Sequence, residues 1–184
     1  MATIALDVDG VICDFVRHWH DCAYAADITL QPIVGKEREW ELENRYAISN
    51  EDYLSVQNQL RHTSPALMRP IDGALPHVNF LMEDHEVYFV TASFVGNPMW
   101  EFGRRAWFRC HLGQDAEERL VFCAKKEIVR ADVFVDDKPE NIVDWVHKGK
   151  NDPRRAILFG ALNGERADAT EWFTLFDKIL TLVA

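Results

Sequence analysis

The stretch IALDVDGVICDF (residues 4–15) places three carboxylates, Asp7, Asp9 and Asp14, in a run that is otherwise almost wholly apolar. An unpaired carboxylate is costly to bury, so a strand of this composition needs a compensating charge at its end. Side chains alternate along a strand, which places Asp7 and Asp9 on the same side, and Gly10 permits the tight turn that follows. We therefore expect a buried strand whose acidic end meets a divalent cation and a lysine.

The fold class follows from the spacing of short apolar runs. Five runs rich in Val, Ile and Phe are expected to be strands: Thr3–Leu6, Glu86–Val90, Leu120–Cys123, Val133–Val135 and Ala156–Phe159. Longer stretches with a helical pattern separate them. This alternation predicts an α/β fold in which helices cover both faces of a parallel sheet.

Helix start and stop signals lie in the second half of the chain. Proline suits the first turn of a helix, glycine commonly follows the last turn, and acids three residues apart fit a capping box. We expect helices from Asn97-Pro98 to Gly113, from Pro139 to Gly149, and from the pair Asp168 and Glu171 toward the C-terminus.

The segment between the first two predicted strands is far longer than a simple crossover requires. It contains helix-patterned fragments at Glu37–Tyr46 and Asn50–Leu60, together with many aromatic side chains. We expect an α/β core made of residues 1–15 and 72–184, with residues 16–71 inserted as a small helical cap.

Composition excludes several classes of protein. The net charge of −10 argues against binding of nucleic-acid duplexes, because no surplus of Lys and Arg is present to neutralise phosphates. No apolar stretch approaches the ~20 residues that span a bilayer, so we expect no membrane insertion. The start of the chain lacks an export signal, and its four cysteines show no C-x-x-C spacing, so we expect a reduced, cytoplasmic protein. The oligomeric state stays open, with a homodimer among the options.

Polar side chains follow the predicted strands at the sheet edge where ligands bind in parallel sheets. They are Asp7 and Asp9 after the first strand, Thr91 and Ser93 after the second, Lys125 and Lys126 after the third, and Asp136 and Asp137 after the fourth. Carboxylates gathered in this way form a hard, all-oxygen site that suits Mg²⁺ better than zinc. The sequence therefore predicts a magnesium site at this edge.

The segments DVDG, FVTAS, AKKE and VFVDD occur in the order of the haloacid dehalogenase superfamily of phosphohydrolases, which the chain resembles. This resemblance implies a Rossmann-like core. Within that superfamily the chain is most similar to the 5′(3′)-deoxyribonucleotidases, on the basis of LDVDGVICDF, DDKPENI and the place of the insertion. The family's spacing between lysine and acidic pair selects Lys126 over Lys125. Where the family usually has Ser after the Thr, this chain has Ala92 and then Ser93.

The resemblance implies metal-dependent hydrolysis of a phosphate monoester and a role for each matching residue. Asp7 would be the nucleophile that forms an aspartyl-phosphate, and Asp9 would protonate the leaving oxygen and then activate water. Lys126, the Thr91 hydroxyl and the backbone N–H of Ala92 would hold the phosphoryl oxygens.

The implied cofactor is Mg²⁺. It would be bound by the Asp7 carboxylate, the backbone carbonyl of Asp9 and Asp136. Asp137 would act through water or would orient the lysine.

The expected substrate is a nucleoside or deoxynucleoside monophosphate. Phe15 matches the family's aromatic residue at that position and could stack on the base, and Trp40 is a second candidate. Core packing stays open for both side chains. Ser93 is expected in the phosphate-binding loop. Two alternatives remain: a phosphatase for another small phosphomonoester or a nucleic-acid 3′ phosphate, and a non-catalytic binding module with the same fold.

Overall fold

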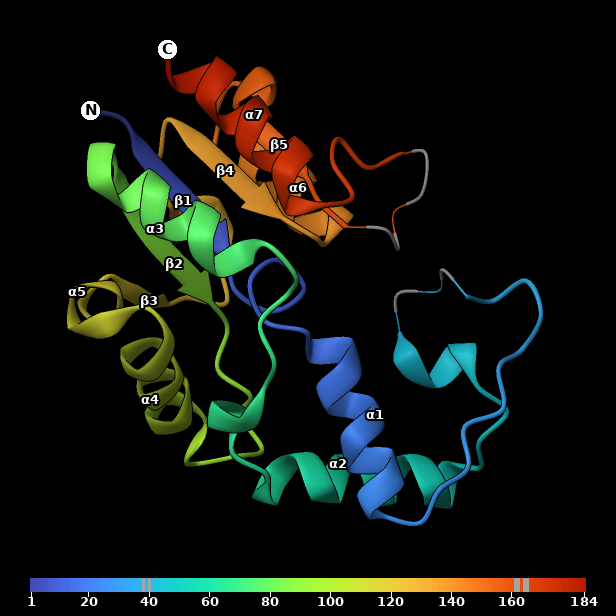
Figure 1. The fold of residues 1–184 in the computed structure, drawn as a ribbon. Helices are drawn as coiled ribbons and strands as arrows, with labels where there is room; N and C mark the ends of the chain where they lie inside the picture. The colour runs from blue at the N-terminus through green and yellow to red at the C-terminus, as the bar shows by residue number, and fades with distance from the viewer. Residues whose placement is uncertain (38, 40, 161–162, 164–165) are drawn as a thin grey trace.

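The computed structural model describes the chain except for residues 38, 40, 161–162 and 164–165. The described residues form a five-stranded parallel sheet in the order β3-β2-β1-β4-β5 (Figure 1). Its strands are β1 (Thr3–Asp7), β2 (Glu86–Thr91), β3 (Leu120–Phe122), β4 (Val133–Asp136) and β5 (Ala156–Leu158). The predicted α/β fold with a parallel sheet is confirmed, and each strand begins at the expected residue.

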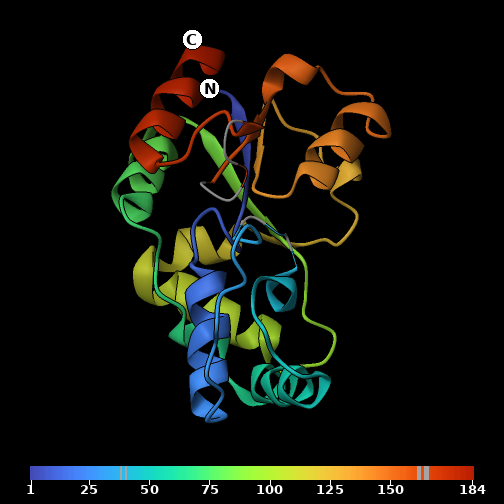
Figure 2. The ribbon, with the colours of Figure 1, turned by 90° about the vertical axis from the view of Figure 1, so that its right-hand side faces the viewer.

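Helices occupy the connections between strands. They are α1 (Phe15–Ala25), α2 (Asn50–His62), α3 (Ala74–Asp84), α4 (Trp100–His111), α5 (Gly113–Glu118), α6 (Pro139–His147) and α7 (Trp172–Val183), with 3₁₀ turns η1 (Leu42–Arg45), η2 (Pro65–Leu67), η3 (Lys126–Ile128) and η4 (Pro153–Arg155). Figure 2 shows α3 and α7 on one side of the sheet and α6 on the other.

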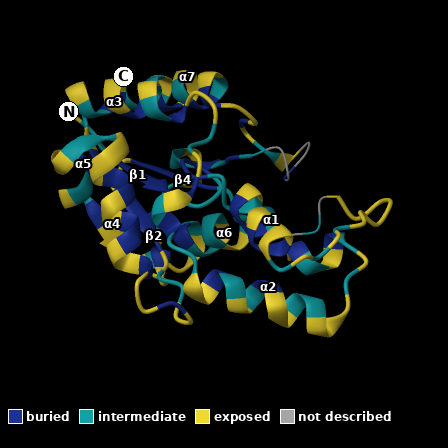
Figure 3. Cartoon of the chain, turned by 60° about the horizontal axis from the view of Figure 1, so that its bottom comes forward, coloured by how far each residue is buried: buried dark blue, intermediate teal, exposed yellow. Residues whose placement is uncertain are grey.

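Both faces of the sheet are buried, which explains why β1 is a continuous apolar run. Ile4 and Leu6 pack into the larger cluster, together with side chains of α3, α4 and α7. Ala5 points to the opposite face. There the ring of Phe134 from β4 stacks on the ring of Trp145 from α6, with centroids 5.2 Å apart. Buried residues accordingly concentrate on β1, β2 and β4 (Figure 3).

Strand register brings the ends of three strands to one edge. Asp7 of β1 lies opposite Val90 of β2, so Thr91 follows one residue beyond it. Leu6 lies opposite Val135 of β4, so Asp136 is level with Asp7. The register of the strands alone therefore places Asp7, Thr91 and Asp136 close together at the carboxyl edge of the sheet.

Two predicted helix starts are wrong. α4 begins at Trp100, because Asn97 caps the preceding turn: its Oδ1 accepts from the Met99 N–H at 2.9 Å, and its Nδ2 donates to carbonyls at the end of α2. The capping box at α7 is absent. Asp168 instead accepts a hydrogen bond from the Leu158 N–H at 2.8 Å, and Glu171 makes no side-chain cap bond.

The first half of the chain differs more from expectation. Helix α2 occurs as predicted, with a capping box at Ser49 and Asp52. Within Glu37–Tyr46, the described residues are helical only in the short turn η1. Helices α1 and α3 were not predicted, because aromatic and histidine side chains weaken the propensity of α1 and a proline lies in the first turn of α3.

Helices α1 and α2 pack through a second apolar cluster of their own. Its buried members are Trp19, Cys22, Ala23, Leu42, Val56 and Leu60. The two chain segments that join this unit to the sheet pair with each other, since the Asp14 N–H donates to the Arg69 carbonyl and the Ile71 N–H donates to the Ile12 carbonyl. In Figure 1 the two helices lie beyond the end of β1.

Helix α4 approaches η2 so closely that only glycine fits at position 103. A Cβ atom there would lie 2.6 Å from Cδ of Pro65 and 2.7 Å from Oγ of Ser64. A proline ring cannot swing aside as a flexible side chain can. This contact fixes the place of the neighbouring residue, Arg104, in the interior.

We expect Gly103→Ala to lower the free energy of unfolding by about 1–2 kcal/mol. Alanine gains about 1 kcal/mol of helix propensity, but overpacking against a rigid ring costs about 1–3 kcal/mol or more. Urea denaturation measures the difference. Gly96→Ala is the control, because the nearest atoms to its Cβ would belong to the side chains of Arg61 and Phe94, at the longer distances of 3.2–3.3 Å. An equally or more stable Gly103→Ala protein would contradict the account.

Candidate active site

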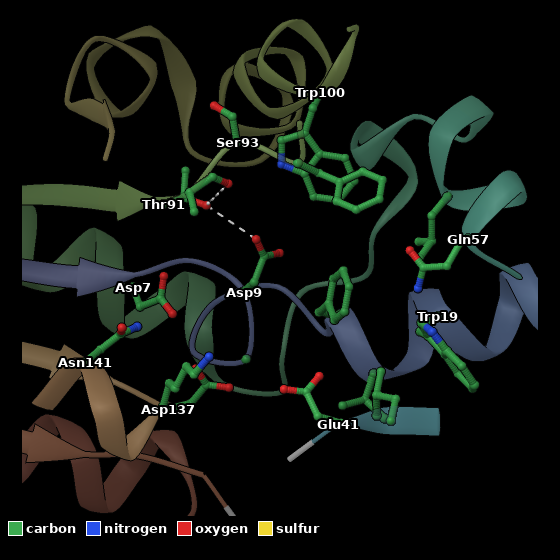
Figure 4. A pocket seen from close by; sticks show the side chains of 18 of the residues that line it. Asp7, Asp9, Trp19, Glu41, Gln57, Thr91, Ser93, Trp100, Asp137 and Asn141 are labelled. Atoms are coloured by element: carbon green, nitrogen blue, oxygen red, sulfur yellow. Dashed lines mark hydrogen bonds between the residues drawn. The ribbon is translucent and has the colours of Figure 1, made fainter. Parts of the chain in front are cut away.

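A cavity of about 400 Å³ opens at the carboxyl edge of the sheet, between the strand ends and the inserted segment. Its sheet side is lined by Asp7, Asp9, Thr91, Lys126 and Asp137, among others. In Figure 4 Trp19, Glu41 and Gln57 lie on the opposite side of the pocket, in the segment between β1 and β2. The predicted polar strand ends are therefore brought together in one pocket.

Asp7 lies at the floor of this pocket with 5% of its surface exposed. Its Oδ1 contacts the Lys126 Nζ at 2.6 Å and accepts from the Val8 N–H at 2.7 Å. Burial, and secondarily repulsion from Asp136, raises the pKa of Asp7 from 3.8 to about 7, although Lys126 opposes the increase. One lysine is thus insufficient to neutralise the acids around it.

Lys126 bridges two carboxylates. Its Nζ donates to Asp136 Oδ2 at 2.8 Å while it contacts Asp7 on the other side. Burial alone would lower the pKa of Lys126, but the two carboxylates outweigh burial and raise it. The neighbouring Lys125 is exposed, so the family spacing selected the lysine that reaches the pocket.

Asp136 and Asp137 complete an acidic group. Asp136 is fully buried, and its carboxylate also accepts from the Lys138 N–H and from Nδ2 of Asn141, both at 2.9 Å. Asp137 lies directly beneath Gly10, where a Cβ atom would come within 1.8 Å of its Oδ2. Burial, reinforced by the charges of Asp7 and Asp136, raises the pKa of Asp137 well above its ordinary value.

This acidic group fits a hard divalent cation. Asp7, Asp136 and Asp137 each offer a carboxylate oxygen within 4.8 Å of the others. Oxygen donors with unbalanced negative charge suit Mg²⁺, whereas zinc prefers nitrogen and sulfur ligands. The carboxylate of Asp9 stands outside this group, so any contribution of Asp9 would come from its backbone carbonyl.

Asp9 turns toward β2 and α4 instead. Its Oδ2 accepts a hydrogen bond from the Thr91 hydroxyl at 3.3 Å (Figure 4), and its Oδ1 pairs with Arg104 at 2.5 Å. The sequence analysis missed Arg104, which is fully buried. A signal was available, because Arg104 is four residues after Trp100 and three before Trp107, on the apolar face of its helix.

The end of β2 and the loop after it form one wall of the pocket. Thr91 is buried at the strand end, and Ala92 and Ser93 follow it along the pocket wall. The Ser93 hydroxyl donates to Glu101 at 2.6 Å, so its hydrogen is already engaged at the start of α4. The Ser93 hydroxyl is therefore directed to α4 in this structure.

The rest of the pocket lining is mainly apolar, with several polar side chains among the apolar ones. Phe15 lines the pocket and also packs against both apolar clusters, so its position agrees with stacking and with core packing alike. Further side chains that the sequence analysis did not single out are Trp19, Leu42, Leu60, Phe94 and Trp100, with the polar residues Glu41, Glu43, Arg45, Tyr53 and Gln57. Trp40 lies outside the described residues.

Comparisons with known proteins agree with this geometry. The model of the family described as 5′ nucleotidase, deoxy (pyrimidine), cytosolic type C protein matches residues 1–180. A 5′(3′)-deoxyribonucleotidase of Bacillus subtilis is 27% identical over 145 residues, covering 76% of this chain and 77% of its own. A candidate 5′(3′)-deoxyribonucleotidase of Bordetella pertussis is 27% identical over 147 residues, covering 74% of each chain.

Solved structures share the fold. A candidate haloacid dehalogenase-like hydrolase from Burkholderia xenovorans LB400 superimposes with a TM-score of 0.59 at 15% identity, over 99% of this chain and 98% of its own.

Within the described part of the chain, no helix has the length and apolar character needed to cross a bilayer. The chain belongs to the 5′ nucleotidase, deoxy (pyrimidine), cytosolic type C family, and it is a phosphatase with the haloacid dehalogenase fold.

Proposed function

We propose that the protein hydrolyses nucleoside or deoxynucleoside monophosphates in an Mg²⁺-dependent reaction that passes through an aspartyl-phosphate on Asp7. The observation that carries the proposal is the Asp7 carboxylate at the floor of the pocket, 2.6 Å from Lys126 and grouped with two further acids. The names of the relatives from Bacillus subtilis and Bordetella pertussis support a nucleotide as the substrate class.

Asp7 is the nucleophile in this proposal. Attack on phosphorus requires the ionised carboxylate, and Lys126 favours that form while burial opposes it. Asp7, Asp136, Asp137 and the backbone carbonyl of Asp9 would hold Mg²⁺. The ion would supply the positive charge that the acids lack and would stabilise charge on the phosphoryl oxygens.

Asp9 serves as acid and then as base. As the phosphorus–oxygen bond breaks, its carboxyl group gives a proton to the leaving oxygen, and its carboxylate then takes a proton from the water that attacks the aspartyl-phosphate. Lys126, the Thr91 hydroxyl and the backbone N–H of Ala92 donate hydrogen bonds to the phosphoryl oxygens. Ser93 contributes by shaping the phosphate-binding loop, which its hydrogen bond to Glu101 ties to α4.

Residues 16–71 act as a cap over the substrate in this proposal. Their separate apolar cluster and the paired connections at Asp14 and Arg69 support a unit that moves as one body. Phe15, at the junction of cap and core, stacks on the base, an interaction that tolerates different bases. Trp40 stays a second candidate for this contact.

The first test is phosphate release from a panel of ribonucleotides, deoxyribonucleotides and sugar phosphates, with Mg²⁺ or EDTA. We expect nucleotides to be preferred, EDTA to stop release, and Asp7→Asn to reduce it by at least about 10³-fold, because the nucleophile is lost. Asp144→Asn, which removes a partly exposed carboxylate paired with Lys148, is the control and keeps full activity.

Other outcomes of this panel separate the alternatives. A preference for sugar phosphates would retain the chemistry and reject the nucleotidase. Release from nucleic-acid 3′ phosphates alone would assign a different substrate. The absence of release from every compound would favour the binding module.

Metal-free protein should lose stability as the pH rises from about 4 to about 7. The pKa of Asp7 is about 7 in the folded protein and ordinarily 3.8. In this window the folded state binds a proton that the unfolded chain has released, so the free energy of unfolding falls with rising pH. Added Mg²⁺ should therefore raise the melting temperature more at pH 7.5 than at pH 5.

Asp7→Asn is the informative variant for this pH dependence. Its free energy of unfolding in EDTA should vary less between pH 4 and 7 than that of the wild type. Thermal denaturation at a series of pH values provides the comparison. An unchanged slope in the variant would show that Asp7 is not the group responsible.

We expect Phe15→Ala to raise KM for nucleotides by about 5- to 100-fold, since base stacking contributes about 1–3 kcal/mol. Hydrolysis of a small phosphomonoester without a base should change little. Phe173→Ala, at an exposed position on α7, is the matched control. Equal losses for both substrate types would mean that Phe15 acts only in packing.

A further inference from the structure

The most unusual charge in the interior belongs to Arg104. Its side chain has no exposed surface, and its guanidinium pairs with the Asp9 carboxylate at 2.5 Å. Isolating a cation in this way is costly unless a partner compensates it. The ion pair joins α4 to the loop after β1, and Asp9 lines the pocket in which phosphate chemistry is proposed.

The surroundings of Arg104 hold it in place but leave Asp9 as its direct charged partner. Two of its nitrogens lie 3.5 Å from Sδ of Met68, and its guanidinium carbon lies 5.4 Å from the centre of the Trp100 ring. Its Nε has no hydrogen-bond partner among the described residues. Packing alone does not require a charged side chain at this position. The guanidinium of Arg104 is instead directed at the carboxylate of Asp9.

Both oxygens of Asp9 are thereby engaged. Arg104 binds Oδ1, and the Thr91 hydroxyl donates to Oδ2 at the longer distance of 3.3 Å. Figure 4 shows the carboxylate directed toward Thr91 and not toward Asp7. The side chain retains 25% exposure, so the carboxylate is fixed on one side and open to the pocket on the other.

We propose that Arg104 is a positioning residue for Asp9, which it orients as the proton donor to the leaving oxygen. This inference rests on the proposed function. Arg104 fixes Oδ1, which leaves Oδ2 as the oxygen that faces Thr91 and the substrate. The role is separate from that of Lys126, whose contacts are Asp7 and Asp136.

The proton balance explains why a cation belongs at this position. When the phosphorus–oxygen bond breaks, its electron pair goes to the leaving oxygen, which takes the proton from Asp9. Before this step the proton is held on Oδ2 of Asp9, while Oδ1 accepts the hydrogen bond from Arg104. The negative charge that develops on Asp9 as the proton leaves is compensated by Arg104 without rearrangement, because the guanidinium is already in place. In the second half-reaction, the same carboxylate takes a proton from the attacking water.

The test compares two leaving groups. A nucleotide has an alkoxide leaving group that requires protonation, whereas p-nitrophenyl phosphate has a good leaving group that does not. General acid catalysis contributes typically 10²–10⁴-fold. We expect Arg104→Met to lower kcat for the nucleotide by about 10²-fold and for p-nitrophenyl phosphate by less than about 5-fold. Arg104→Lys, which keeps the charge, should recover at least about 10-fold of the nucleotide rate.

Two controls separate positioning from folding. Arg105→Met changes the neighbouring exposed arginine on the same helix and should alter neither rate. In an Asp9→Asn background, Arg104→Met should add less than about 3-fold to the loss, because its effect passes through Asp9. If Arg104→Met does not fold, Arg104→Lys and the Asp9→Asn double variant provide the comparison.

The outcomes are distinguishable. Loss confined to the nucleotide, with recovery in Arg104→Lys, supports the inference. Equal losses for both substrates, or a full additional loss in the Asp9→Asn background, would overturn it while the wild-type activity leaves the proposed function intact. A wild type that hydrolyses neither compound would overturn both.

Discussion

The contact between one buried lysine and two carboxylates is the constraint on which the rest of the site depends. Lys126 lies 2.6 Å from Asp7 and 2.8 Å from Asp136, and these acids come from neighbouring strands of the sheet. Parallel register brings them level, so the fold itself creates the repulsion that the lysine only partly relieves. The remaining negative charge suits a divalent cation, and in the proposed function that cation would in turn attract the anionic phosphoryl group.

The pocket has two walls of different origin and chemistry. Strand ends supply the charged floor, whereas the inserted segment supplies aromatic and polar side chains above it. Helix α4 links the two, because Gly103 lets it approach η2 and its next residue, Arg104, reaches Asp9. A helix that covers the sheet thereby also contacts a side chain that lines the pocket.

The sequence was sufficient for the sheet and for the residues that follow its strands, because apolar runs and parallel register are local and repetitive signals. It failed where tertiary contacts override propensity. Asn97 and Asp168 carry capping signals but bind distant backbone groups, so their helices begin later. Arg104 was missed because its partner, Asp9, is distant in the sequence. A charged residue on an apolar helix face can be assigned a role only when that partner is known. The substrate wall was equally inaccessible, since Gln57 and Glu41 meet the strand ends only in the folded chain.

The central claim is that Asp7 carries the phosphoryl group during turnover. The most direct test is a rapid acid quench of a single turnover with Mg²⁺ and a nucleotide, followed by borohydride reduction and peptide mass spectrometry. An aspartyl-phosphate is reduced to homoserine, so the account predicts homoserine at position 7 and unmodified Asp9. Product formation without any modified residue 7 at any quench time would contradict the covalent mechanism.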